Sequence, residues 1–166
     1  MKTPELKQIR AWIIVFMSGI IITGITTFPL ESELKWLNDH SSIFPSFLKD
    51  WVQSVTTAII DTNNNYPFIM YGTDWLAFAH IIIGLLFIGV YRDPVKNKWI
   101  IEWAILCCVL VIPLALIAGP AREIPWFHIV IDCSFGVIGV FPLLIVRKKI
   151  KLIETIEMEK QRNSPL

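Results

Sequence analysis

Four stretches of this chain are long and apolar enough to cross a lipid bilayer, and no other feature constrains its fold as strongly. A spanning helix needs about 20 mostly apolar residues, because lipid offers no hydrogen-bond partner to an exposed backbone amide or carbonyl. The predicted spans cover residues 11–30, 73–91, 98–118 and 125–146. The sequence therefore predicts an all-α fold: an integral membrane four-helix bundle, formed as a single transmembrane domain over residues 1–166.

The composition agrees with a membrane protein. Hydrophobic residues make up 54% of the 166 positions and charged residues only 17%, against about 25% charged in ordinary soluble domains. The net charge of +1 gives no electrostatic reason to expect a nucleic acid as a partner. The three cysteines lie inside apolar runs without metal-binding spacing, so we interpret them as small buried residues.

The basic residues predict the orientation, because Lys and Arg are enriched in cytoplasmic loops. Twelve of them fall in the N-terminal segment, the connection at 92–98 and the C-terminal tail. These three segments lie on the same side of the membrane if the chain crosses it four times. Only Lys35, Lys49 and Arg122 fall on the other side. We therefore expect both termini in the cytoplasm. The first span is too long for the apolar core of a signal peptide and lacks a cleavage site, so we expect it to remain as an uncleaved span. A bacterial inner membrane is the simplest expected location, because we find no organelle-targeting segment and no glycosylation acceptor in the sequence.

Two segments lie outside the predicted spans. Residues 31–72 are expected on the extracytoplasmic side, where apolar residues at helical spacing between 47 and 59 predict an amphipathic helix of about 15 residues on the membrane surface. A shorter helix is expected near 32–38, and residues 61–65 are expected to form a turn. The tail at 147–166 is expected to extend the fourth helix into the cytoplasm and to contact anionic lipid headgroups.

Three polar residues inside the spans predict a site, since an ionisable group in a bilayer normally faces a partner or a wet cavity. His80 and Asp132 each lie about seven residues inside the outer end of a span, which is about 10 Å at 1.5 Å per residue. His128 precedes Asp132 by four residues and so shares its helix face. We expect the three side chains to converge between the second and fourth spans, with Asp74 and Arg122 at the mouth of the pocket.

Several kinds of chemistry fit this set. Two imidazoles and one carboxylate are common ligands of a divalent metal such as zinc or iron. Haem b held by His80 and His128 is an alternative, although their predicted depths differ by one turn, about 5 Å. A third interpretation is a structural or accessory subunit, in which a histidine–aspartate contact only fixes helix packing. The leading hypothesis is an outward-facing pocket that binds a small ligand or a metal ion, and no catalytic residue is predicted.

The order of the segments resembles the four-helix membrane module of sterol isomerases and sigma-2 receptors in topology alone: one span, a long outer segment, then three spans. This resemblance implies a pocket for a small molecule or lipid between helices, and no residue role is carried over from it.

Four further residues have ordinary structural interpretations. Asp74 suits the first turn of a helix, where the helix dipole favours a negative charge. Arg122 is expected to reach the headgroups or to pair with Glu123. Glu102 is expected to reach water or to pair with Lys98, four residues earlier. Gly136 extends the face of His128 and Asp132, and a small residue there would let another helix approach closely.

Overall fold

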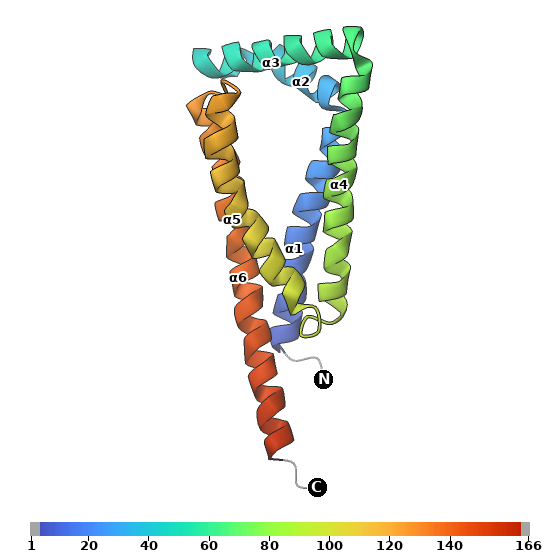
Figure 1. Ribbon diagram of the computed structural model, residues 1–166, viewed down its shortest axis with the longest axis vertical. Helices are drawn as coiled ribbons and strands as arrows, with labels where there is room; N and C mark the ends of the chain where they lie inside the picture. The colour runs from blue at the N-terminus through green and yellow to red at the C-terminus, as the bar shows by residue number, and fades with distance from the viewer. Residues whose placement is uncertain (1–3, 164–166) are drawn as a thin grey trace. The chain divides into compact units, whose positions relative to one another are not determined.

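The computed structural model describes residues 4–163, and this part of the chain contains six α-helices, one short 3-10 helix and no strand (Figure 1). The elements in order are α1 (Pro4–Thr27), α2 (Leu30–Asp39), η1 (Ser41–Ile43), α3 (Ser46–Asn65), α4 (Pro67–Arg92), α5 (Lys98–Ala121) and α6 (Trp126–Arg162). Four of them, α1, α4, α5 and α6, are long and apolar enough to cross a membrane. The predicted all-α fold with four such helices is confirmed.

The helix ends differ from the predicted boundaries. The second long helix, α4, begins at Pro67 and not near Thr73, because proline suits a first helical position, where its missing N–H is no loss. The expected turn at 61–65 is wrong: these residues are the last turn of α3, where the Asn65 side chain donates to the backbone oxygen of Asp61. The fourth long helix, α6, extends sixteen residues past the predicted span end at Val146, as the tail prediction requires.

The chain divides into two compact units. One comprises Met1–Met17 and Leu86–Leu166, of which residues 4–17 and 86–163 are described, and the other comprises Ser18–Leu85. The long helices α1 and α4 each contribute to both units. Lys2, which belongs to the predicted cytoplasmic set, lies outside the described residues.

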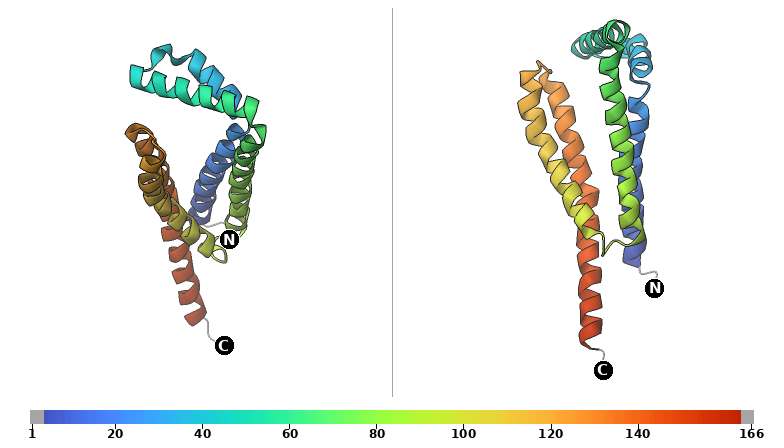
Figure 2. Two further views of the ribbon diagram at one scale, coloured as in Figure 1. Left: turned by 45° about the horizontal axis from the view of Figure 1, so that its top comes forward. Right: turned by 45° about the vertical axis from the view of Figure 1, so that its right-hand side comes forward.

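The first unit is built on the pair α5 and α6, which lie side by side in all views (Figures 1 and 2). Gly136 permits this close approach, since a Cβ atom there would overlap the backbone carbonyl oxygen of Cys108. The predicted role of Gly136 is thus confirmed, and its neighbour is α5. The buried side chains of this pair include Ile101 and Ala104 on α5 and Leu143 and Ile150 on α6.

Aromatic and charged contacts complete this unit. Phe16 of α1 meets Phe87 of α4 edge to face, with ring centroids 5.0 Å apart. Glu102 pairs with Arg147 of α6, whose Nε lies 3.3 Å from its carboxylate. Lys98 pairs with Glu154 at 2.8 Å. The expected pairing of Glu102 with Lys98 is therefore wrong, because the packing of α5 on α6 offers each of them an opposite charge from the neighbouring helix.

In the second unit, α2 packs against α3. Thr56 is buried in this contact, and its hydroxyl donates to the backbone oxygen of Val52 at 2.7 Å. This satisfies a polar group that would otherwise be costly to bury. The middle of α4 lies close to the end of α1 at Gly24, where a Cβ atom would lie 2.7 Å from the backbone oxygen of Ala77. Gly24 is therefore required for this helix contact, as small residues commonly are between membrane helices.

Candidate functional site

His80 lies in the second unit, on α4 beside Gly24 of α1. A Cβ atom added to Gly24 would lie 3.0 Å from the Cβ of His80. The imidazole Nδ1 lies 2.8 Å from the backbone oxygen of Leu76. A carbonyl oxygen only accepts hydrogen bonds, so Nδ1 carries the proton and, in the neutral ring, Nε2 is the acceptor. The helix backbone thus selects the tautomer that leaves Nε2 available to a donor or a metal ion.

His128 and Asp132 lie one turn apart on α6, in the first unit. The Nε2 of His128 is 3.7 Å from Oδ1 of Asp132, and 41% of each side chain is exposed. This distance allows an ion pair when the imidazole is protonated and is too long for a hydrogen bond. The prediction that both residues share one helix face is confirmed.

The convergence of His80 with His128 and Asp132 stays a prediction, because His80 belongs to the second unit and the other two residues belong to the first. Within each unit, the described residues contain no group of three or more His, Cys, Asp or Glu side chains arranged to hold a metal ion. Neither unit alone therefore supplies the predicted metal site.

Arg122 is the C-cap residue of α5, and backbone hydrogen bonds close the C-terminal end of this helix. The Ile124 N–H donates to the Gly119 oxygen at 3.0 Å and the Glu123 N–H to the Pro120 oxygen at 3.1 Å, with Glu123 at a φ of 58°. This is the Schellman pattern, in which a left-handed residue lets the chain close over the last carbonyls. The expected ion pair between Arg122 and Glu123 is absent from the described residues.

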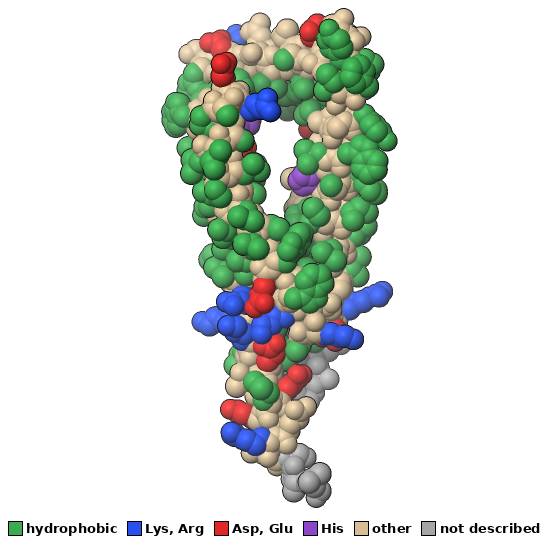
Figure 3. Space-filling model, in the orientation of Figure 1, with side chains coloured by type: hydrophobic (Ala, Val, Ile, Leu, Met, Phe, Trp, Pro, Cys, Tyr) green, Lys and Arg blue, Asp and Glu red, His purple; other side chains and the backbone are tan. Residues whose placement is uncertain are grey.

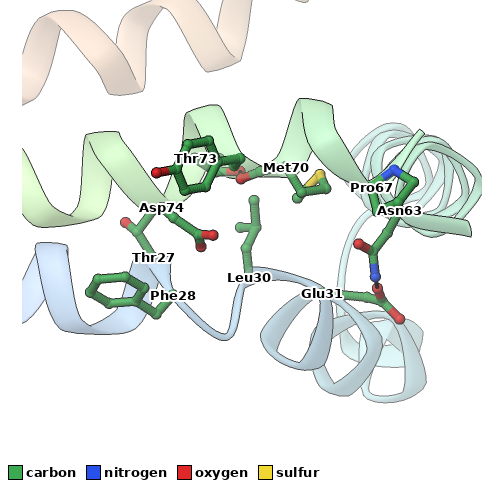
Figure 4. A pocket seen from close by; sticks show the side chains of 10 residues that line it. Thr27, Phe28, Leu30, Glu31, Asn63, Pro67, Met70, Thr73 and Asp74 are labelled. Carbon is green, nitrogen blue, oxygen red and sulfur yellow. Dashed lines mark hydrogen bonds between the residues drawn. The ribbon is translucent and has the colours of Figure 1, made fainter.

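Asp74 has a different setting from the one predicted. Because α4 begins at Pro67, Asp74 is in its second turn and not in the first, so the expected stabilisation by the helix dipole is wrong. Asp74 instead lines a cavity of about 310 Å³ in the second unit. The cavity lies between the end of α1, the start of α2, the end of α3 and the first turns of α4 (Figure 4). Its lining comprises Thr27, Phe28, Leu30, Glu31, Asn63, Pro67, Met70, Tyr71, Thr73 and Asp74.

Two carboxylates in this cavity have unlike surroundings. Glu31 pairs with Lys35 and accepts a hydrogen bond of 2.7 Å from the Asn63 amide. The hydrogen bond from Lys35, followed by that from Asn63, lowers the pKa of the Glu31 carboxyl below its ordinary value of 4.5. In Figure 4 the Asp74 carboxylate points towards the turn that carries Phe28 and Leu30. No ion pair or hydrogen bond joins Asp74 to another described side chain.

Sequence reasoning missed Glu31 and Asn63. The spacing of Glu31 and Lys35 is a recognisable helical ion pair. The contact between Glu31 and Asn63, however, joins residues 32 positions apart and follows only from the packing of α2 on α3.

No family model matches the chain, and no curated protein or solved structure shows significant similarity to it.

Proposed function

We propose that this chain is a bacterial inner membrane protein that binds a small cationic amphiphile in the cavity beside Asp74, on the extracytoplasmic side. Four long apolar helices make it a multi-pass membrane protein. The distribution of basic residues, twelve against three, supports cytoplasmic termini and an extracytoplasmic position for α2 and α3.

The observation that carries the proposal is the cavity itself. Its volume of about 310 Å³ falls at the lower end of the range for small-molecule sites, about 300–1,000 Å³. The walls combine apolar side chains, such as Phe28, Leu30 and Met70, with a few polar groups from four helices. Such a lining suits a ligand with an apolar body and one polar end.

The charge of the ligand follows from the two carboxylates. Glu31 is already compensated by Lys35, so its negative charge is not available to a ligand. Asp74 lies on an apolar helix without a basic partner among the described residues. A carboxylate near hydrocarbon is costly unless water or an opposite charge meets it. An alkylammonium group would supply that charge, while its chain would contact Phe28 and Leu30.

Protection of an engineered thiol tests this proposal. Met70→Cys in a background of C107A, C108A and C133A places one thiol in the cavity wall. We expect dodecylamine to slow its reaction with N-ethylmaleimide, whereas dodecanoate does not. Asp74→Asn is expected to abolish this protection, while Glu33→Gln, a nearby acidic residue outside the lining, keeps it. Equal protection by both amphiphiles, or protection that survives Asp74→Asn, would contradict the proposal.

The orientation has its own test. Gln53 of α3 and Thr155 of α6 are both exposed, so a cysteine at either position would react with a thiol reagent. With a membrane-impermeant maleimide on intact cells, we expect Gln53→Cys to be labelled and Thr155→Cys to be labelled only after lysis. The reverse pattern would overturn the orientation and leave the cavity unaffected.

A second candidate is the site predicted from His80, His128 and Asp132, for a small ligand or a divalent metal. The separation of 3.7 Å between His128 and Asp132 and the available Nε2 of His80 favour it. In the cysteine-free background, a disulfide between His80→Cys and Asp132→Cys is expected under mild oxidation. His80→Cys with Val137→Cys, on another face of α6, is the control. Equal cross-linking of both pairs, or none, would reject this candidate.

A further inference from the structure

The segment of α6 from Leu143 to Thr155 has two unlike faces. Leu143, Val146 and Ile150 are at most 1% exposed and form the buried face. With 3.6 residues per turn, Arg147 and Glu154 fall on this same side of the helix. Both residues form ion pairs with α5, Arg147 with Glu102 and Glu154 with Lys98. The charges on the buried side are thus compensated by the neighbouring helix.

The opposite face of the same segment is basic. It borders an open hollow of about 580 Å³, which is lined by Ile145, Lys148, Lys149, Lys151, Leu152 and Thr155. The spacing of Ile145, Lys148, Lys149 and Leu152 places them on one stripe of the helix. Figure 3 shows Lys and Arg side chains gathered at one level of the molecule, beside the apolar side chains of the long helices.

The lysines of this hollow are not compensated. None of the three forms an ion pair with an acidic side chain in the described part of the chain, and Glu102 and Glu154 on the buried side already have basic partners. Three positive charges therefore surround the apolar side chains of Ile145 and Leu152. This combination complements a ligand with an anionic head and an apolar body.

We propose that this hollow binds an anionic phospholipid, whose phosphate contacts Lys148, Lys149 and Lys151 and whose first acyl carbons pack on Ile145 and Leu152. The position on the helix favours a lipid over a soluble polyanion, because the hollow begins where the apolar run of α6 ends. Basic residues next to a membrane span attract anionic headgroups, and their aliphatic stems can lie along the hydrocarbon boundary.

The test compares lipid selectivity of the intact protein in nanodiscs. Spin-labelled phosphatidylglycerol and phosphatidylcholine report how strongly each lipid associates with the helices. The variant K148Q/K149Q/K151Q removes the three charges, and K96Q/K160Q/R162Q, with the same change of net charge, is the control. Both leaflets of a nanodisc have the same composition, so the result does not depend on the orientation in the cell.

We expect the unchanged protein and the control variant to prefer phosphatidylglycerol, and the triple-lysine variant to lose this preference. High salt is expected to weaken it in the unchanged protein. The proposal is overturned if the triple-lysine variant keeps the preference, if the control loses it equally, or if the unchanged protein binds polyuridylate and shows no lipid preference. Circular dichroism establishes that the variants are folded, and the single variants K148Q and K151Q replace the triple variant if it is not.

Discussion

The carboxylate of Glu102 on α5 lies 3.3 Å from Nε of Arg147 on α6, a contact between residues 45 positions apart. Both side chains are about half exposed, with fractions of 46% and 40%. The pair lies one turn inside the start of α5, where the helix enters its apolar stretch. Together with the pair of Lys98 and Glu154, it joins α5 to α6 at this end of the first unit.

A double-mutant cycle measures this pair. Exposed ion pairs contribute about 0–1 kcal/mol, because solvent screens them and ordering two long side chains costs entropy. We expect Glu102→Gln and Arg147→Gln each to destabilise the protein slightly, with a coupling energy within that range. Reversible unfolding in mixed micelles, followed by circular dichroism, gives the value. Strictly additive effects of the two substitutions would show that the contact does not stabilise the fold.

A larger loss of stability is expected from a substitution at Gly136. A Cβ atom at this position would overlap the backbone oxygen of Cys108, which no rotamer change can relieve. We expect Gly136→Ala to destabilise the protein by about 1–3 kcal/mol, as overpacking does in a close-packed core. Gly72→Ala is the matched control, because no atom lies within 4 Å of a Cβ there and alanine is the better helix former. If both substitutions have the same effect in the unfolding assay, the close approach of α5 and α6 is not what Gly136 provides.

The sequence predicted the four apolar helices well, because each needs only a long run of apolar residues. It also predicted that His128 and Asp132 share a face, since that follows from helical periodicity alone. The prediction for Asp74 failed because the apolar run does not show where α4 begins. The helix starts at Pro67, nearly two turns before the predicted start of the span at residue 73, so Asp74 is not in its first turn. The cavity was beyond prediction, because contacts such as that of Glu31 with Asn63 depend on how α2 and α3 pack.

The lowered pKa of Glu31 has a measurable consequence. Glu31 lies in α2, and its carboxylate is stabilised by Lys35 and Asn63. A carboxyl group whose pKa is lower in the folded state stabilises the fold at pH values above its ordinary pKa. That contribution is lost as the pH falls from 4.5 through the folded pKa.

In a ¹³C carboxyl titration, we expect Glu31 to titrate below 4.5. Lys35→Gln should raise its pKa more than Asn63→Ala does. A Glu31 that titrates normally in all three proteins would refute this network.

Glu123 offers a stabilising substitution. Its φ of 58° places it in the left-handed region, which is disfavoured for any residue with a Cβ atom and is readily adopted by glycine. Because the two backbone hydrogen bonds of this helix stop involve only main-chain atoms, glycine can keep both of them. We expect Glu123→Gly to stabilise the protein by up to about 1 kcal/mol. Glu157→Gly is the control: it lies inside α6 and should destabilise that helix by about 1 kcal/mol. Unfolding free energies of the two variants, measured under the same conditions, should therefore change in opposite directions. A loss of stability in both would show that the Glu123 side chain makes a contribution larger than the cost of its backbone conformation.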